Sequence, residues 1–443
     1  MGLRMLFNIT GLHDLEATNY SHQKEFQLRE LIFMKNSYQK QTRPVATVDV
    51  NVSLSVITFN SLDVRDQLLT TTGYFRMAWI DKRLDWSQNP KFSSDIMAIH
   101  TDEETIWRPA LILDNSVSDM SVMSDTSIPI RLLYDGSILW TPSGIYKTVC
   151  ETDVTFYPFD TQVCEITVRP FGYTSFEIML NSSPLAIDNL KKNGEWEYIS
   201  SSTRSTLKGK GKNTFSTVSF IFILKRRPMY HVLNTLTPTI LLAFLSCMAF
   251  KLPAESGERI GYSLTVLLSY AVYLTLVAED IPATYVTTPL LSLYLLFILT
   301  LGMLSVILTI MVLECHHTDQ QAEVPKWVML TVDFLLILSL QMQKRHSHFC
   351  RCSFVKTRNT MDASKEVSNN LKKDTQGKAI VQELEGSYAI ESCTWIEIGR
   401  LLDKSFLRLF LFIVFIVTCT FITALYIGYN TPVLYPDIAQ SEP

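Results

Sequence analysis

One segment past the middle of the chain carries residues that could line a path for ions. Read as a helix, it places a carboxylate at each end of one face, with small, hydroxyl and apolar residues between them. The face consists of Glu258, Gly261, Thr265, Leu268, Val272, Leu276 and Glu279. Rings of carboxylates concentrate cations, and apolar rings close a pore by dewetting. The same stripe also suits a face packed against other helices, where Gly and Thr allow close approach.

This segment is one of four long apolar runs in the C-terminal half of the chain. Hydrophobic residues make up 47% of the 443 residues and charged residues only 19%, which is fewer charges than a soluble protein usually carries. Each run is long enough to cross about 30 Å of hydrocarbon as a helix. We predict membrane helices over Val232–Phe250, Ile260–Ala278, Pro289–Leu313 and Leu409–Gly428.

The distribution of basic residues predicts how these helices are oriented. The Ala278–Pro289 connection and the Tyr429–Pro443 tail contain no Lys or Arg, whereas the Glu314–Arg408 loop contains thirteen. Positive residues stay on the cytoplasmic side. We therefore expect a multi-pass plasma-membrane protein with both termini outside the cell.

The chain before the first apolar run has the pattern of an all-β domain. Short stretches of alternating residues recur between turn signals, as in Thr47–Ile57, Leu68–Trp79, Cys164–Val168 and Thr217–Leu224, and such repetition is typical of a sandwich. Leu28–Met34 has a more helical pattern. The predicted domains are a β-sandwich over 1–230, three membrane helices over 231–314, a cytoplasmic loop over 315–405, a fourth helix over 406–429 and an extracellular tail over 430–443. Within the loop we expect an interfacial helix over Val324–Lys344 and a helix over Ala379–Ser405 that continues into the last span.

Cysteine and asparagine positions agree with this topology. Cys150 and Cys164 are the two cysteines of the predicted extracellular half, where a disulfide can form. The other six lie in membrane helices or the cytoplasmic loop. Glycosylation sequons begin at Asn8, Asn19, Asn51 and Asn181, although such triplets also arise by chance.

The segment between the two cysteines carries a distinctive motif. Thirteen residues separate Cys150 from Cys164, and they include Tyr157-Pro158-Phe159-Asp160. This spacing and motif resemble the signature of the Cys-loop receptors. Trp79-Ile80-Asp81 and Trp140-Thr141-Pro142 resemble nicotinic acetylcholine receptor subunits. The resemblance implies the Cys150–Cys164 disulfide, an extracellular immunoglobulin-like sandwich, a four-helix membrane bundle, and a pentamer whose second helices line the pore.

The resemblance also implies an ion preference. Anion-selective members usually carry a Pro-Ala insertion before the pore helix, and that insertion is absent here. The segment Leu252–Arg259, including its Pro253-Ala254, itself resembles nicotinic subunits. We therefore expect Glu258 to form the selectivity ring for cations. Arg259 is expected to point away from the pore.

A ligand pocket of aromatic side chains is implied as well, because family members bind a cationic amine over ring faces between subunits. Tyr74, Phe171 and Phe215 match three positions of this aromatic box, and Tyr173 lies close to Phe171 in the sequence. Each of these residues would also fit the core of a β-sandwich. Asp114 stands where an aromatic residue is expected, and the loop over Tyr198–Phe215 lacks the adjacent cysteine pair of α subunits. That loop carries Lys208, Lys210 and Lys212. It suits an anionic or zwitterionic ligand, or else it is a solvated flap.

For coupling between pocket and gate, the resemblance points to a basic residue before the first membrane helix. Arg226 matches it, and Asp160 and Asp63 are available as carboxylate partners. A buried arginine without a carboxylate is costly, so we expect at least one of these pairs. Pro282 lies in the linker on which the coupling loops would act.

Two functions from different classes remain open. The first is a subunit of a ligand-gated cation channel. Its partners would be four further subunits, identical or different, a small-molecule agonist, the lipid bilayer and monovalent cations. Permeation of divalent cations and a postsynaptic location stay open. The second is an accessory subunit that binds no agonist itself, which the incomplete aromatic box favours. We find no nucleophile–base pair, phosphate loop or metal cluster, so we expect neither an enzyme, a cofactor nor a nucleic-acid partner.

Overall fold

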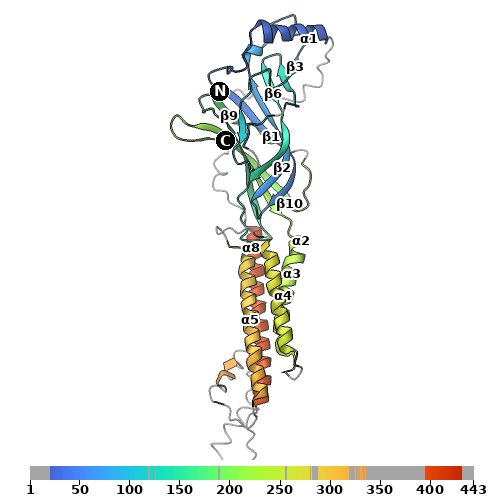
Figure 1. The fold of residues 1–443 in the computed structure, drawn as a ribbon, viewed down its shortest axis with the longest axis vertical. Coiled ribbons are helices and arrows are strands. Elements are labelled where there is room, and N and C mark those ends of the chain that lie inside the picture. The colour runs from blue at the N-terminus through green and yellow to red at the C-terminus, as the bar shows by residue number, and fades with distance from the viewer. Residues whose placement is uncertain are drawn as a thin grey trace, which may run out of the picture. The chain divides into compact units, whose positions relative to one another are not determined.

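The structure is a computed structural model. It describes residues 20–431 apart from 118–119, 125, 188–189, 255–256, 280, 282–287, 319–324, 326–327, 329, 333 and 336–394. The chain forms two compact units. We call the unit built on residues 20–228 the β unit, and the unit built on 229–278 and 288–428 the helical unit (Figure 1).

The β unit is a sandwich of two sheets. A seven-stranded sheet has the order β3-β5-β6-β2-β1-β9 with β7 also paired to β2, and a four-stranded sheet has the order β10-β11-β8-β4. The first sheet contains β1 (Val48–Asp63), β2 (Leu68–Ile80), β3 (Ala98–Thr101), β5 (Ile130–Leu133), β6 (Ser137–Trp140), β7 (Ser143–Val149) and β9 (Ile178–Ser182). The second contains β4 (Leu111–Leu113), β8 (Thr161–Pro170), β10 (Trp196–Lys208) and β11 (Phe215–Arg226).

Alternation along the strands builds the core between the sheets. Val50, Val52 and Leu54 of β1 are buried while the residues between them face outward or are half-buried. Phe75 of β2 and Phe220 of β11 are both buried, with ring centroids 6.1 Å apart. Strand β11 differs from the expected alternation because it is buried on both sides over most of its length. An N-terminal helical segment, α1 (His22–Arg29) followed by a π-helical turn (Glu30–Lys35), confirms the helical pattern expected there.

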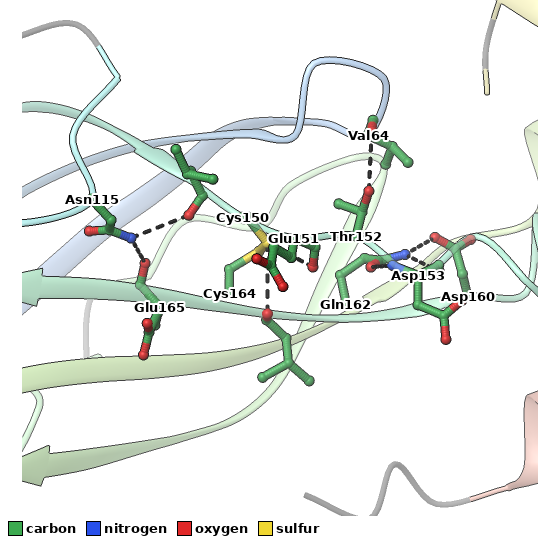
Figure 2. Close-up of a disulfide and its surroundings, with 12 residues drawn as sticks. Val64, Asn115, Cys150, Glu151, Thr152, Asp153, Asp160, Gln162, Cys164 and Glu165 are labelled. Carbon is green, nitrogen blue, oxygen red and sulfur yellow. Dashed lines mark hydrogen bonds between the residues drawn. A yellow bond between two sulfur atoms is a disulfide. The ribbon is translucent and has the colours of Figure 1, made fainter. Parts of the chain in front are cut away.

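A disulfide ties the two sheets together. Cys150 follows β7 of one sheet and Cys164 lies in β8 of the other, and they are bonded with Cα atoms 4.9 Å apart. Both are buried. Figure 2 shows Asn115 beside the bridge, donating to the backbone oxygens of Val149 (3.2 Å) and Glu165 (2.8 Å). The predicted disulfide is therefore present.

Among the residues that the structure describes, the helical unit has four helices long and apolar enough to cross a membrane. They are Met229–Lys251, Arg259–Glu279, Leu290–His317 and Trp395–Asn430. The first is composed of α2 (Met229–His231), a π-helical turn (Val232–Leu236), α3 (Thr237–Met248) and a 3₁₀ turn (Ala249–Lys251). The others are α4 (Arg259–Glu279), α5 (Leu290–His317) and α8 (Trp395–Asn430). Each predicted apolar run is thus a helix.

Aromatic contacts hold α8 against its neighbours. Tyr294 of α5 stacks on Phe421 of α8 with centroids 4.4 Å apart, and its hydroxyl lies 3.1 Å from that of Thr418. Phe250 packs against Phe410 at 5.1 Å. Near the other end of α8, a side chain at Gly399 would place its Cβ 3.1 Å from the His316 ring. Glycine therefore permits the close approach of α5 and α8 at this point.

The last helix is longer than its apolar run. It begins at Trp395, well before Leu409, so the described end of the predicted Ala379–Ser405 helix continues into the span; its earlier part lies outside the described residues. Ile398 is buried with Val328 and Val332. These two belong to the expected Val324–Lys344 helix, whose described residues are helical from Val328 to Leu335.

Candidate functional site

Helix α4 has two distinct faces within the chain. Its buried residues are Arg259, Ser263, Val266, Tyr270 and Val277. All seven residues of the predicted ion-lining face are exposed: Glu258, Gly261, Thr265, Leu268, Val272, Leu276 and Glu279. Leu268 is 64% exposed, Val272 53% and Leu276 55%. In a helix long enough to cross a membrane, three large apolar side chains in one exposed row can face lipid, a neighbouring helix or a pore.

Three tyrosines fix the rotation of α4. The hydroxyl of Tyr270 donates to the Thr239 carbonyl at 2.8 Å, and that of Tyr262 donates to the Leu245 carbonyl at 2.9 Å. Tyr273 bonds the Thr235 carbonyl at 3.0 Å. All three acceptors lie on the first membrane helix, so the opposite side of α4 is the one left exposed. Nothing in the spacing of the apolar run predicted these hydrogen bonds, because their acceptors are backbone atoms of another helix.

Arg259 turns away from the exposed face, as expected. Its side chain is 1% exposed and forms a two-point ion pair with Asp403 of α8, with one N···O distance of 3.0 Å. The Phe250 ring lies 5.9 Å from its guanidinium carbon. The positive charge next to Glu258 is therefore neutralised on the side facing α8. Sequence reasoning missed Asp403, which lies 144 positions from Arg259.

We expect the Asp403→Asn substitution to destabilise the subunit. The change leaves a buried guanidinium without its counter-charge, and breaking a buried pair from one side costs about 3–5 kcal/mol. Surface expression should fall sharply, which biotinylation of intact cells would measure. Lys404→Gln, at an exposed neighbour, is the matched control. The double change Arg259→Gln with Asp403→Asn should recover expression, and equal losses for single and double variants would contradict the pairing.

In the β unit, one cluster contains two of the five predicted ligand residues, Asp114 and Phe215. Strand β4 pairs with β8 so that Ile112 lies opposite Arg169, and this brings the following Asp114 into an ion pair with Arg169. The guanidinium of Arg169 also lies 5.2 Å from the centroid of the Phe215 ring. Lys208, opposite Phe215 in the β10–β11 register, places its Nζ 3.7 Å from Asp114. Sequence reasoning named Asp114 and Phe215 but missed Arg169, which joins them.

A cavity of ≈ 290 Å³ opens beside this cluster. Its lining consists of Arg169, Pro170, Gly172, Tyr173, Thr174, Asn213, Thr214 and Phe215. Ser175 holds the two sides of the cavity together, because its backbone N–H donates to the Thr214 carbonyl at 2.7 Å and the two hydroxyls lie 2.8 Å apart. Tyr173 thus reaches the cavity with Phe215, whereas Phe171 is 52% exposed and does not line it.

The basic segment before Phe215 is a strand and a tight turn. Strand β10 runs through Lys208 and only residues 209–214 form the turn, so the expectation of a loop over Tyr198–Phe215 is wrong for most of its length. Backbone pairing with β11 explains the difference. Gly209 has φ +116°, and a Cβ there would lie 2.3 Å from the Asn213 carbonyl oxygen, so this turn requires glycine.

Tyr74 lies apart from these residues. It belongs to β2 of the seven-stranded sheet, opposite Ser55 of β1 and Ser143 of β7. The other ligand candidates are on or next to strands of the four-stranded sheet.

Arg226, at the end of β11, is the centre of a second buried cluster. Its guanidinium binds Asp160 at 2.8 and 3.2 Å and Glu195 at 2.6 Å, and it lies 4.3 Å from the Trp196 ring. The predicted pair with Asp160 is therefore present. Asp63 has another role, since it accepts from the backbone N–H of Asp66 in the β1–β2 turn. Glu195 supplies the second carboxylate, a contact that arises because Trp196 pairs with Arg226 in the sheet.

We expect Asp160→Asn to lower the stability of the β unit more than Glu195→Gln. Asp160 is almost fully buried whereas the Glu195 side chain is 49% exposed, and exposed partners of an ion pair contribute little. Loss of the buried partner should cost about 3 kcal/mol or more. Thermal unfolding of the purified full chain would measure this, and a larger effect from Glu195→Gln would contradict it.

The remaining predicted site residues fall into two groups. Asn51 and Asn181 are exposed on adjacent strands, where β1 and β9 pair them directly; their glycosylation stays a prediction. Asn8, Asn19 and Pro282 lie outside the described residues. Within the described ranges no group of three or more His, Cys, Asp or Glu side chains is placed to hold a metal ion.

Comparison with known protein families shows which family this chain belongs to. Residues 27–228 match the neurotransmitter-gated ion-channel ligand binding domain, and residues 235–388 match the neurotransmitter-gated ion-channel transmembrane region. The chain belongs to the Cys-loop family of neurotransmitter-gated ion channels. It is a channel-family subunit and not an enzyme, and its helices make it a multi-pass membrane protein. The family forms pentameric channels that bind neurotransmitters.

Relatives of this Cys-loop subunit are nicotinic. It is 33% identical to the neuronal acetylcholine receptor subunit alpha-4 of Mus musculus over 70% of this chain and 49% of that protein. It is 34% identical to the alpha-4 subunit of Gallus gallus over 70% of this chain and 50% of that subunit. It is 30% identical to the beta-2 subunit of Gallus gallus over 69% of this chain and 62% of that subunit. The chain thus spans about half the length of the alpha-4 relatives.

Proposed function

We propose that this chain is a subunit of a pentameric, agonist-gated channel in the plasma membrane, selective for cations and lined by α4. The observation that carries the proposal is the exposed face of α4. It bears Glu258 and Glu279 at its ends and Leu268, Val272 and Leu276 between them. Repeated five times around an axis, that face gives two carboxylate rings separated by apolar rings, which supplies both an ion preference and a gate.

The position of Arg259 supports the cation preference. A positive charge beside each Glu258 would weaken the carboxylate ring if it shared the pore. Because Asp403 binds the guanidinium on the opposite side of α4, the ring keeps its net negative charge. We also propose that both termini are extracellular, because the loop before α8 is rich in Lys and Arg and such loops stay in the cytoplasm.

An accessory role is the second candidate, because one observation favours it. The Arg169 guanidinium occupies the ring face of Phe215 on which an agonist amine would bind. In that role the chain would contribute its α4 to a heteropentamer while other subunits bind the agonist. Nicotinic-like relatives alone do not separate these two roles.

Expression of the chain alone and then with candidate partner subunits separates the two functions. A ligand-gated subunit should give agonist-evoked current alone or change the agonist preference of a mixed pentamer. An accessory subunit should alter conductance but leave agonist preference unchanged. If the Thr265→Cys variant reaches the surface in mixed pentamers and its thiol never reacts with a pore-blocking reagent, α4 does not line the pore.

A further inference from the structure

The Arg169 cluster has the wrong charge for a cationic amine. The face of an aromatic ring attracts cations, and the Phe215 face already carries the guanidinium of Arg169, whose carbon lies 5.2 Å from the ring centroid. Asp114 is the carboxylate of this cluster, and it is shared between Arg169 and Lys208. The ring and the carboxylate that could hold an amine are thus both bound to the protein's own cations.

The surroundings add positive charge. Lys210 and Lys212 lie in the exposed turn after Lys208, and Glu177, near the cavity, forms an ion pair with Arg43 at 3.4 Å. Glu177 also accepts hydrogen bonds from the backbone N–H and the hydroxyl of Thr174. These bonds lower the pKa of the Glu177 carboxyl and occupy one of its carboxylate oxygens. Like charges at short range repel, so a second cation entering this cavity would meet an excess of positive charge.

Arg169 still has hydrogen-bonding capacity. Its bond to Asp114 uses Nε, and within the described part of the chain its two amino groups make no other hydrogen bond. The side chain is 23% exposed and lines the cavity. A guanidinium presents paired N–H groups that match the two oxygens of a carboxylate. The cavity, at ≈ 290 Å³, is close in volume to the smallest small-molecule sites, which start at about 300 Å³.

We propose that this cavity binds a small carboxylate ligand through the amino groups of Arg169, with the lysines of the β10–β11 turn adding attraction, and that it excludes cationic amines. The proposal rests on the function proposed above in taking this cavity as part of the agonist site. The ligand's apolar part lies against Tyr173 and the rim of Phe215. Asp114 positions the guanidinium and, as an anion, limits the affinity for the ligand.

Saturation-transfer NMR on the purified full-length protein tests this with two probes of similar size, butyrate and choline. Butyrate should give a saturable signal and choline none. Arg169→Gln should weaken butyrate binding at least tenfold, and Lys192→Gln, an exposed lysine outside the cluster, should leave it unchanged. Choline binding, or butyrate binding that survives Arg169→Gln, would overturn the proposal. Absence of binding by both probes would overturn it too and would favour the accessory role.

Asp114→Asn guards against a result caused by misfolding. The change removes the competing anion while leaving Arg169 in place, so butyrate should bind several-fold more tightly, which damaged protein cannot do. Weaker butyrate binding in Asp114→Asn would contradict the proposed role of Asp114. The pore is judged separately, by cation current in the Leu268→Ser variant described below. Current without butyrate binding refutes only this inference, and butyrate binding without current refutes only the proposed channel function.

Discussion

Replacing Glu258 with alanine should degrade cation selectivity far more than replacing Glu279. Glu258 lies at the start of α4, where the five helices of a pentamer would bring their carboxylates around a narrow water column. A carboxylate and a cation about 6 Å apart attract by about 3 kcal/mol at an effective dielectric constant of 20. Loss of the ring should lower the sodium-to-chloride permeability ratio at least about tenfold, equivalent to about 1.4 kcal/mol.

Glu279 is the matched control for this experiment, because it is the same residue type on the same exposed face. We expect the outer mouth at Glu279 to be wider and better hydrated, so that the charge there is screened over about 8 Å in physiological salt. Glu279→Ala should change the permeability ratio by less than about twofold, which is under 0.5 kcal/mol. Reversal potentials in asymmetric NaCl measure both variants. Equal shifts for the two glutamates, or no shift for Glu258→Ala, would show that Glu258 does not set selectivity.

Replacing Leu268 with serine should produce a standing current without agonist. Leu268 is the most exposed apolar residue of the α4 face, at 64%. Five such side chains would exclude water from the closed pore. At each position of the ring, serine removes three carbon groups, the γ-CH and the two methyl groups of leucine, and adds a hydroxyl. Each buried methylene-sized group is worth about 0.8 kcal/mol. The closed, dewetted state should therefore lose stability relative to the open state.

Whole-cell recording with and without an open-channel blocker measures this standing current. Leu293→Ser is the control, since Leu293 is also exposed, at 51%, but lies on α5. It should leave the resting current unchanged. A Leu268→Ser channel that reaches the surface and stays silent at rest would contradict a gate at this position, as would equal currents from both serine variants.

The parts of this protein that were predictable from sequence depend on local patterns. The four membrane helices follow from the length of the apolar runs, and the exposed α4 face follows from helical spacing within a single segment. The disulfide follows from two cysteines in one half of the chain. Spacing within α4 shows which residues share a face, although hydrogen bonds to the first membrane helix decide which face is exposed. The disulfide was expected because the spacing of its two cysteines resembles that of the Cys-loop receptors.

The features that sequence analysis missed depend on contacts between distant residues. Arg169 meets Asp114 across 55 positions, and Asp403 meets Arg259 across 144. Glu195 reaches Arg226 only because β10 and β11 align in one register. Periodicity carries no information on such pairs, since the register and the helix rotation are set by packing. Arg169, which carries charge beside the cavity, and Asp403, which pairs with Arg259, therefore emerged only from the structure.

The reversal potential of the unmutated channel tests the central claim most directly. When external NaCl is lowered tenfold, a pore that passes only cations should shift its reversal potential by about 59 mV in the negative direction, the tenfold value for a single charge. An anion pore shifts by the same amount in the positive direction. A clear negative shift is the result expected of a pore lined by the Glu258 ring. A positive shift would contradict the assignment of α4 as the wall of a cation channel.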